Sequence, residues 1–356
     1  MRDGKVGFAI VGGGLIAPVH AAAIREIPGA ELVAVVDPAP GVAARRGEEL
    51  GVPHHAELDA ALDRPDVDVV CVCAPTGLHA EIAVRAAGAG KHVAVEKPID
   101  VSLDAADRLI AACRDAGVKL TVLSQNRFAP AFLELRELIE AGRLGRLLIG
   151  DASIKWYRSP EYYRSAGWRG TRSLDGGGCL MNQGIHYVDV LRWLMGPVRS
   201  VVARTSTLLH EIEVEDVAMA VLRFESGAMG VLEAATVVYP GLTERLEVTG
   251  TNGTVIVERG ETALRRLRDE ADTGPRPPAE DDWGWARAAA QPASISPRGH
   301  AAQLGDMVAA IREDREPQVT GEDGRRPLEI VLAVYESSRT GREVSLPLNA
   351  DADRRA

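Results

Sequence analysis

The fold is decided by the stretch VGFAIVGGGLIA at residues 6–17. Its apolar first half is typical of a strand, and the residues after the glycines are typical of the start of a helix. Gly12, Gly14 and Ala17 fit the G-x-G-x-x-G/A pattern in that position. The first glycine permits a sharp turn, the second lets backbone N–H groups approach a pyrophosphate, and the alanine lets helix and strand pack closely. The stretch therefore predicts a Rossmann dinucleotide-binding domain.

A carboxylate follows at the spacing that this interpretation requires. Asp37 stands twenty residues after Ala17, at the end of an apolar run over 32–36, where it can accept both ribose hydroxyls of an adenosine. Its charge would repel a 2′-phosphate, so we expect NAD rather than NADP, although Arg45 and Arg46 lie about two helical turns further on. The alternative to a dinucleotide site is that these glycines serve only to form a tight turn.

Strand-like and helix-like stretches then alternate as far as residue 125. Near-continuous apolar runs indicate strands covered by helices on both faces, and hence a parallel sheet. We expect strands at 67–73, 92–95 and 120–123, and helices at roughly 15–27, 42–50, 79–88 and 103–116. Residues 1–125 are the predicted NAD(P)-binding Rossmann domain.

The pattern changes in the second part of the chain. Alternating or meandering strands indicate a sheet with one face on helices and one face open. We expect a helix at 181–194, strands at 201–207, 217–224, 228–235, 245–249 and 254–257, and closing helices near 300–311 and 328–340. Asn252-Gly253 is a strong hairpin signal. The fold class is therefore α/β, with a C-terminal α+β domain over 126–356 on an open, predominantly antiparallel sheet.

Two further expectations concern surfaces of that domain. The open sheet face would expose apolar residues, for example on 217–224, so we expect a homodimer or homotetramer. Residues 269–299 are rich in Pro, Ala, Asp and Glu. They are either an ordinary surface insertion or a flap over the active site.

Composition narrows the partners. The net charge of −10 disfavours a nucleic-acid partner, because phosphate backbones are bound by clustered Lys and Arg. Residues 1–11 show no secretory signal and the chain has no apolar span for a membrane, so we expect a cytoplasmic protein with a small-molecule substrate. Cys71 and Cys73 share one side of a strand but no second ligand pair stands at metal spacing. We expect no metal site.

A possible proton carrier follows the strand at 92–95. In Glu96-Lys97-Pro98, the proline keeps Lys97 out of the helical region, so its side chain can be aimed into a cleft at the carboxyl end of the sheet. Lys97 could there take a hydroxyl proton during hydride transfer. A solvent-facing turn is the alternative for this tripeptide.

A second constellation runs from Asp175 to Asp189, as DGGGCLMNQGIHYVD. The glycines would let a ligand approach the start of a helix. On that helix Asn182, His186 and Asp189 are spaced to lie on one face. His186 could share a proton with Lys97, and Asp189 could orient the imidazole or bind a hydroxyl. A solvated helix face is the alternative.

In combination, these three motifs resemble the glucose-fructose oxidoreductase and inositol dehydrogenase family (Gfo/Idh/MocA) over nearly the whole chain. Supporting stretches are Pro75-Thr76-Gly77-Leu78-His79, Asn126-Arg127-Phe128, Trp168-Arg169 and the segment around His300. The resemblance implies an NAD(P)-dependent sugar or cyclitol dehydrogenase that oxidises a ring secondary alcohol to a ketone. It makes Lys97 the catalytic lysine and His186 its acid/base partner, and places the loop of Thr76 and His79 against the nicotinamide ribose.

The expected site residues follow from the motifs and the resemblance together. We expect cofactor contacts from Gly12, Gly14, Leu15, Ile16, Asp37, Pro75, Thr76, His79, Glu96, Lys97, Gln125, Trp168 and Arg169. We expect substrate contacts from Lys97, Arg127, Tyr157, Asn182, His186 and Asp189. Where the common family pattern has Asp, this chain has Asn182, an amide that cannot take a proton, so Lys97 and His186 are the expected carriers.

The segment from Trp168 to Gly184 is similar to the branch that contains nucleotide-sugar 3-dehydrogenases. The preceding Trp156, Tyr157, Arg158, Tyr162, Tyr163 and Arg164 are either a loop that contacts sugar or phosphate, or packing at a subunit interface. Two other functions stay open at this point. One is a glycoside hydrolase that retains NAD and oxidises its sugar transiently, and the other is a dinucleotide-binding regulator, which would not need Lys97 and His186 together.

Overall fold

The chain divides into two compact units. The computed structural model describes residues 4–270 and 296–348. The first unit contains Met1–Gln125 and Ser296–Arg325, and the second contains Asn126–Ile295 and Arg326–Ala356. We expected the second domain to hold everything from 126 to 356, but 296–325 return to the first unit. Most of the loop predicted at 269–299, and with it the possible flap, lies outside the described residues.

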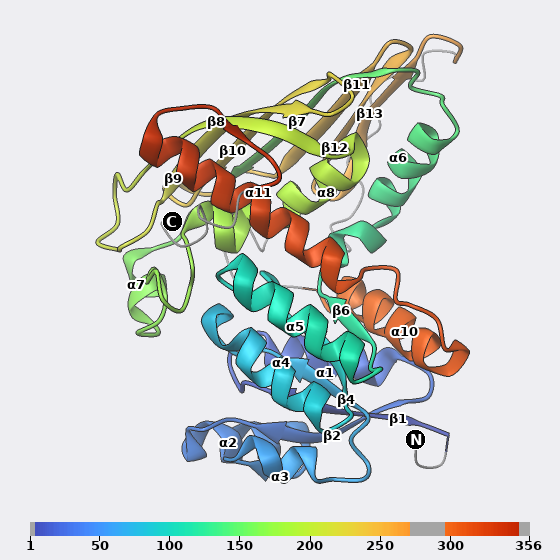
Figure 1. Cartoon of the computed structure of the whole chain (residues 1–356), viewed down its shortest axis with the longest axis vertical. Coiled ribbons are helices and arrows are strands. Elements are labelled where there is room, and N and C mark those ends of the chain that lie inside the picture. Colours follow the sequence, from blue (N-terminus) through green and yellow to red (C-terminus); the bar gives the residue numbers. More distant parts are fainter. Residues whose placement is uncertain (1–3, 271–295, 349–356) are drawn as a thin grey trace. The chain divides into compact units, whose positions relative to one another are not determined.

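A six-stranded parallel sheet forms the first unit (Figure 1). The strands are β1 (Val6–Val11), β2 (Ala30–Val36), β3 (His54–His55), β4 (Val69–Val72), β5 (His92–Val95) and β6 (Leu120–Val122). Their order in the sheet is β3-β2-β1-β4-β5-β6. The order reverses between β1 and β4, and open α/β sheets bind ligands at the carboxyl ends of the strands on either side of such a point. The predicted parallel sheet is thus confirmed; the two-residue strand β3 was not predicted.

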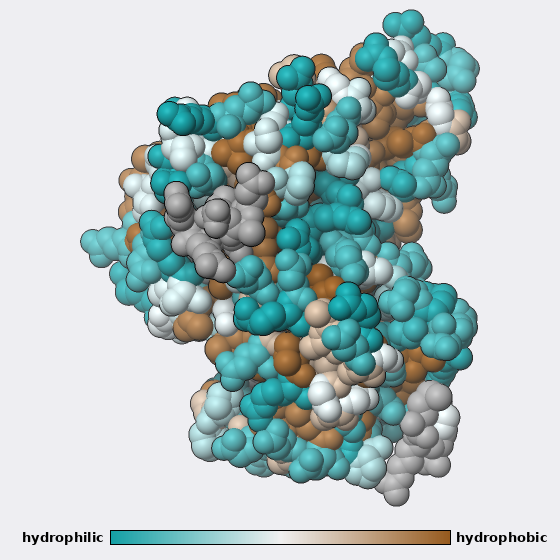
Figure 2. All heavy atoms as spheres, viewed as in Figure 1, coloured by the Kyte–Doolittle hydropathy of each residue, from teal (hydrophilic) through white to brown (hydrophobic). Residues whose placement is uncertain are grey.

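Helices connect these strands. They are α1 (Ala17–Glu26), α2 (Pro40–Leu50), α3 (Leu58–Leu62), α4 (His79–Gly88), α5 (Leu103–Asp115) and, after the second unit, α10 (Arg298–Glu313). α10 belongs to the first unit because its apolar side chains Leu304, Met307 and Val308 are buried in the same core as β1 and α1. In Figure 2 the outward side of α10 is covered mainly by hydrophilic residues, which is the expected amphipathic division.

The second unit is built on an eight-stranded sheet (Figure 1). Its strands are β7 (Leu147–Lys155), β8 (Val198–Ser206), β9 (Val217–Phe224), β10 (Met229–Ala235), β11 (Arg245–Gly250), β12 (Gly253–Glu258), β13 (Glu261–Leu267) and β14 (Val344–Ser345). In the order β13-β12-β11-β7-β10-β9-β8-β14, β7 and β10 pair in parallel and the other neighbours are antiparallel. The open, predominantly antiparallel sheet and the hairpin at Asn252-Gly253 are confirmed. β7, β13 and β14 were not predicted.

The helices of the second unit are α6 (Pro130–Glu140), α7 (Pro160–Arg164), a π-helix (Cys179–Gly184) and α8 (Ile185–Met195); α11 (Gly321–Thr340) starts in the first unit. We predicted one continuous helix over 181–194, but the residues before Ile185 form the wider π-helical turn. Ser337 Oγ accepts the N–H of Ala203 at 3.0 Å and so ties α11 to β8.

One face of the second sheet carries exposed apolar side chains. Burial alternates along β9, where Ala218, Ala220 and Leu222 are buried while Met219 and Val221 are 53% and 44% exposed. Neighbouring strands add to the same face, because Val221 pairs with Val202 on β8 and with Val231 on β10. We call this set, Ile149, Val202, Met219, Val221, Met229 and Val231, the open sheet face.

Within the described residues, no helix combines the length and the hydropathy that crossing a membrane would require. All four cysteines are buried and carry no disulfide. Burial raises the pKa of the Cys71 and Cys73 thiols, and a thiol with a raised pKa is a poor nucleophile.

Candidate active site

The glycine turn after β1 has the geometry that the sequence predicts. Gly12 has a φ of +106°, and a Cβ there would lie 2.5 Å from the carbonyl oxygen of Cys73, so both its conformation and its closeness to β4 require glycine. A Cβ on Gly14 would meet nothing within 4 Å. The space beside Gly14 is thus open at the start of α1, where backbone N–H groups and the helix dipole favour an anion.

Asp37 lies against this turn. Its Oδ2 accepts the N–H of Gly13 at 2.8 Å and its Oδ1 accepts the N–H of Ala39 at 2.9 Å. Arg46, on the other side, donates through Nη2 to the carbonyl oxygens of Gly13 and Gly14 at 3.0 and 3.2 Å. The carboxylate is therefore held at the end of β2, as predicted, and the guanidinium of Arg46 is used by the turn itself and by Glu49.

The segment after β4 is fixed from within. Thr76 begins a short 3-10 turn and is buried. His79, the first residue of α4, is 1% exposed, and its two ring nitrogens contact backbone carbonyls: Nε2 lies 2.9 Å from Ala74 O and Nδ1 lies 2.8 Å from Pro98 O. Burial lowers the pKa of His79. The neutral ring carries one N–H and so donates to one of these two carbonyls. The predicted contact of His79 with a ribose stays a prediction.

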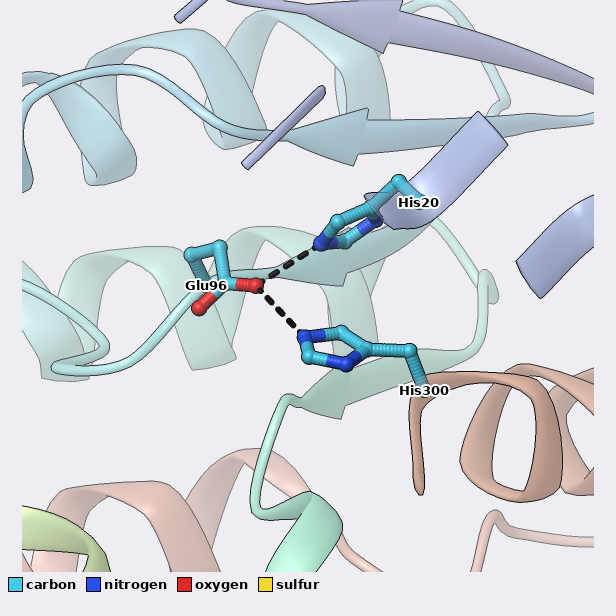
Figure 3. A group of neighbouring side chains, drawn as sticks. All are labelled: His20, Glu96 and His300. Carbon is cyan, nitrogen blue, oxygen red and sulfur yellow. Dashed lines mark hydrogen bonds and ion pairs between the residues drawn. The ribbon is translucent and has the colours of Figure 1, made fainter. Parts of the chain in front are cut away.

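Lys97 follows β5 at the same edge of the sheet. It is half-buried, its bond to Pro98 is cis, and its N–H donates to Oε2 of Glu96 at 3.2 Å. Glu96 itself is buried, with Oε1 2.7 Å from Nε2 of His20 and 3.4 Å from Nε2 of His300 (Figure 3). We predicted Glu96 as a cofactor contact, and the structure directs its carboxylate at two histidines.

These two histidines were not predicted as site residues. His20 lies on the buried face of α1 and His300 on the buried face of α10. A polar residue at a core position of an amphipathic helix is the signal that could have identified each one. Their partner in the chain could not have been chosen from spacing alone, because the three residues are separated by 76 and about 200 positions.

The glycine run of the second unit is packed against protein. A Cβ on Gly177 would lie 2.2 Å from the Tyr335 hydroxyl, and one on Gly178 would lie 1.7 Å from the carbonyl oxygen of Glu215. The interpretation that these glycines make room for a ligand is therefore wrong at Gly177 and Gly178. Gly177 makes room for Tyr335 and Gly178 for Glu215, whose carboxylate accepts the N–H groups of Gly178 and Leu180, each at 2.9 Å.

The three polar residues of the predicted stripe have different partners. Asn182 donates through Nδ2 to Oδ1 of Asp175 at 2.8 Å. Asp189 is buried and forms a bidentate ion pair with Arg127, with N···O distances of 2.6 and 2.8 Å. His186 is half-buried near the start of α8. The stripe is broken because the π-helix changes the phase of the residues before Ile185.

The pairing of Arg127 with Asp189 bears on their expected roles. Each was predicted as a substrate contact, but both charged groups are directed at each other and are about 95% buried. The guanidinium of Arg127 also lies 5.7 Å from the ring centroid of Trp193, which is on α8 like Asp189. These contacts fix α8, and we do not include either residue among the substrate ligands proposed below.

Two arginines, Arg158 and Arg169, stack on aromatic side chains of the stretch from Trp156 to Trp168. Arg158 is buried with its guanidinium 4.7 Å from the ring centroid of Trp156 and 5.4 Å from that of Tyr162. Arg169 lies 4.2 Å from the Tyr162 centroid and 4.6 Å from that of Trp168, and it donates to the Tyr162 hydroxyl. We call these five residues the arginine–aromatic cluster. Burial lowers the pKa of Arg158.

The remaining predicted contacts are placed as follows. Leu15 is 56% exposed beside the glycine turn and Ile16 is the residue that precedes α1. Pro75 precedes the 3-10 turn of Thr76. Gln125 ends the first unit with a buried Oε1 that has no hydrogen-bond partner among the described residues. Tyr157 packs edge-on against Tyr239.

Two family models match the chain. Residues 6–124 match the oxidoreductase family with an NAD-binding Rossmann fold, and residues 132–256 match the GFO/IDH/MocA C-terminal domain. The chain is a member of the GFO/IDH/MocA family. It is accordingly an NAD-binding dehydrogenase that acts on CH–OH groups, as the sequence predicts.

Individual members of the GFO/IDH/MocA family match over nearly their whole length. The myo-inositol 2-dehydrogenase of Thermotoga maritima is 29% identical, covering 95% of this chain and 98% of that protein. The scyllo-inositol 2-dehydrogenase (NAD(+)) of Bacillus subtilis is 28% identical and covers 96% of each. The crystal structure of the WlbA dehydrogenase from Bordetella pertussis, in complex with NADH and UDP-GlcNAcA, is 34% identical with a TM-score of 0.85, covering 97% of this chain and 100% of that one.

Membership in the GFO/IDH/MocA family agrees with the donor set of the first unit. NAD needs an anion site for its pyrophosphate and an acceptor for its ribose hydroxyls. The open space at Gly14 supplies room at the start of α1, and Asp37 supplies the carboxylate beside it. The residues present thus fit the cofactor.

Proposed function

We propose that the chain oxidises a secondary ring hydroxyl of a sugar-like substrate to a ketone, with Lys97 and His186 as the proton carriers. NAD, when bound, supplies the hydride acceptor. Lys97 supports this proposal because it is half-buried at the carboxyl end of β5, and its backbone is held by Glu96 and by His79 through Pro98. A lysine held in this way can present one nitrogen to a hydroxyl proton.

His186 is proposed as the second carrier. It is the second residue of α8, and the elements around it are fixed by Glu215 on the glycine run and by the buried Arg127–Asp189 pair. Asn182 carries an amide, which can donate or accept a hydrogen bond but cannot exchange a proton near neutral pH. We therefore propose that Asn182 only orients a substrate hydroxyl.

The arginine–aromatic cluster supports an anionic substrate. Within the described part of the chain Arg169 has no acidic partner, and its guanidinium stacks on Tyr162 and Trp168. Guanidinium groups held by aromatic rings are suited to phosphate and carboxylate groups. The WlbA dehydrogenase, in whose structure UDP-GlcNAcA is bound, is similar over the whole length. We propose a nucleotide sugar as the substrate class, ahead of free sugars and cyclitols.

We also propose that the open sheet face is covered in a homodimer or homotetramer. Val202, Val221 and Val231 pair across β8 to β10, Ile149 on β7 pairs with Met229, and the six apolar side chains have exposed fractions of 44–54%. An apolar area of this kind is more stable against a second copy than in water.

NADH formation at 340 nm tests the reaction. The wild-type protein is assayed with NAD⁺ against UDP-linked sugar acids, free hexoses and inositols, beside Lys97→Ala and His186→Asn. We expect turnover with the nucleotide sugars and a loss of at least about 100-fold in each variant, since general acid–base catalysis contributes that much. Near-wild-type turnover of Lys97→Ala would overturn the mechanism, and release of an aglycone without NADH accumulation would indicate the NAD-retaining hydrolase instead.

Arg169→Met tests the substrate class, with Arg164→Met as the matched control because Arg164 is 70% exposed in the same segment and is paired with Glu161. If Arg169 binds an anionic group of the substrate, KM for the nucleotide sugar rises about tenfold, the loss of one charged hydrogen bond, while KM for NAD⁺ is unchanged. A rise in KM for NAD⁺ alone would assign Arg169 to the cofactor, as sequence analysis predicted.

A further inference from the structure

The side chains of His20, Glu96 and His300 form a buried cluster in the first unit (Figure 3). They come from α1, from the end of β5 and from α10, and their exposed fractions are 0%, 7% and 1%. Oε1 of Glu96 lies 2.7 Å from Nε2 of His20 and 3.4 Å from Nε2 of His300. The two imidazole rings meet edge-on at 5.1 Å between centroids.

Two histidines and a carboxylate are also a set that can bind a metal ion. Ligand atoms around a tetrahedral Zn²⁺, each about 2.0–2.1 Å from the ion, lie about 3.3 Å from one another. His20 Nε2 and Glu96 Oε1 are only 2.7 Å apart, which is the length of a direct charge-assisted hydrogen bond. The geometry therefore indicates a hydrogen-bonded cluster.

The positions of the protons follow from the contacts. Nδ1 of His20 and both ring nitrogens of His300 are buried and have no hydrogen-bond partner among the described residues, since Nε2 of His300 lies 3.4 Å from Oε1 of Glu96 without hydrogen-bond geometry. An imidazolium would bury an unsatisfied N–H at Nδ1, which is costly. A neutral His20 with its proton on Nε2 instead donates to Oε1 of Glu96 at 2.7 Å, and the Nε2 of His300 makes a longer contact with the same oxygen. Burial lowers the pKa of His300, in agreement with a neutral ring.

Glu96 is then the charged member of the cluster. Burial by itself would raise the pKa of Glu96, but the contacts with His20 and His300 outweigh it and hold the pKa well below its usual range. A buried carboxylate that stays ionised needs a cation or donors nearby. Lys97, the next residue, interacts electrostatically with His300 in this cluster.

The same carboxylate holds the backbone of Lys97. Oε2 of Glu96 accepts the N–H of Lys97 at 3.2 Å, and His79 holds the carbonyl of Pro98 at 2.8 Å. Lys97 is thus fixed on both sides by buried side chains. The elements so connected are β5, α1, which begins at the cofactor turn, and α10.

We propose that His20, Glu96 and His300 are a positioning unit, which keeps one negative charge beside the ammonium of Lys97 and holds the lysine in place for proton transfer. This inference rests on the proposed role of Lys97. None of the three residues needs to touch substrate. Among the residues that the structure describes, the other titratable groups that interact with Glu96 are His79 on α4, Cys71 on β4 and Cys73, which follows β4. Asp100, which interacts with His79, adds a second negative charge nearby.

The decisive variant is Glu96→Gln, which keeps the size of the side chain and an oxygen for the Lys97 N–H but removes the charge. A carboxylate close to a lysine raises the lysine pKa by about 1–3 units. Oxidation of an alcohol needs Lys97 as a neutral base, so loss of the charge moves the rising limb of the kcat–pH profile toward lower pH by about one unit. Glu81→Gln, an exposed carboxylate on α4, is the matched control and leaves the limb in place.

Glu96→Asp separates charge from position, and it tests the proposal if Glu96→Gln does not fold. The shorter side chain keeps the charge but cannot reach both His20 and the Lys97 N–H. We expect the rising limb of the kcat–pH profile to stay within about 0.3 pH units of its wild-type position, because the charge remains. We expect kcat to fall about tenfold, because the lysine is displaced.

The outcomes distinguish the two proposals. If Lys97→Ala is inactive while Glu96→Gln leaves the limb unmoved, the positioning unit is refuted and the role of Lys97 stands. An unchanged kcat in Glu96→Asp would refute it equally. If Lys97→Ala keeps wild-type turnover, both proposals fail. One zinc ion per chain in the purified protein would show that the three residues bind metal and would overturn the inference.

Discussion

Asn182 is oriented by Asp175: its Nδ2 donates to Oδ1 of the carboxylate at 2.8 Å. The second oxygen of Asp175 accepts the N–H of Gly170 at 2.8 Å, and the carboxylate is buried. A carboxylate that receives two donors in this way is suited to be ionised. An amide fits opposite it and a second carboxylate does not, which gives a physical reason for the departure at residue 182 from the common family pattern.

Asn182→Asp should therefore destabilise the protein at neutral pH by about 1–3 kcal/mol, because two carboxylates would face each other in a buried site. One of them would bind a proton with a raised pKa, so the loss should shrink as the pH falls from 7.5 toward 5. Urea unfolding at both pH values measures it. The exchanged pair Asp175→Asn/Asn182→Asp should regain most of the stability, since an amide at 175 can still accept from Gly170; a double variant no better than the single one would contradict this account.

The buried pair of Arg127 and Asp189 predicts a strongly non-additive double-mutant cycle. Arg127→Met or Asp189→Leu leaves one buried charge without its counter-ion and should cost about 3–5 kcal/mol of unfolding free energy. Arg127→Met/Asp189→Leu removes both charges and should cost less than either single variant. Costs that simply add would show that the two residues do not act as a pair.

The position of Asp37 predicts that the protein prefers NAD⁺ to NADP⁺. Asp37→Ser removes a charged acceptor for the ribose hydroxyls, which is worth about 1.5–3 kcal/mol, so KM for NAD⁺ should rise about 10–100-fold. The repulsion of a 2′-phosphate also disappears, so the preference for NAD⁺ over NADP⁺ in kcat/KM should narrow. Asp63→Ser, at an exposed position after α3, serves as the control. An unchanged preference would remove Asp37 from the cofactor site.

The histidine–carboxylate cluster predicts sensitivity to acid. The pKa of Glu96 is held low, so its contribution to stability is present above the unfolded value near 4.5 and is lost as the pH falls through the folded value. The lowered pKa of His300 acts in the same direction below pH 6.5, where the unfolded chain takes up a proton first. Unfolding free energy should fall by up to about 1.4 kcal/mol per pH unit for each group, and His300→Gln should flatten the slope between pH 6.5 and 5. A slope unaltered by that substitution would count against a neutral, buried His300.

The open sheet face predicts the effect of a charge on assembly. Val221 pairs with Val202 and Val231 near its middle, so Val221→Glu should shift the molar mass measured by light scattering toward that of one chain of 38.0 kDa. Leu208→Glu is the control, because Leu208 is 70% exposed and lies in the loop after β8. A wild-type protein that already elutes as a monomer would refute the assembly.

Local signals explain which parts of the structure the sequence predicts well. The glycine turn, Asp37 and the buried strands of the first unit depend on neighbours within a few residues, and the structure has them where the patterns indicate. The strand β7 was missed because only three of its nine positions are buried and Asp151 and Lys155 interrupt its apolar residues. The return of 296–325 to the first unit was missed for another reason, since the partners of α10 in the core are distant in sequence.

The site shows the same division. Lys97 and His186 stand in motifs that can be recognised from the sequence alone. The residues that fix their surroundings belong to no such motif. Glu215 lies 37 residues after Gly178, and His300 about 200 residues after Glu96. The face shared by Asn182 and Asp189 was predicted from helical spacing, and a π-helical turn changes that spacing without an unmistakable signal in the sequence.

The place of α10 in the first unit has a consequence for synthesis of the chain on the ribosome. Leu304, Met307 and Val308 are buried among the side chains of β1 and α1, so a nascent chain that ends at residue 125 has an apolar surface with nothing yet to cover it. The dinucleotide-binding unit can close only after the whole intervening unit has been translated. Early chaperone association, followed by late acquisition of protease resistance, is the order of events expected during its biogenesis.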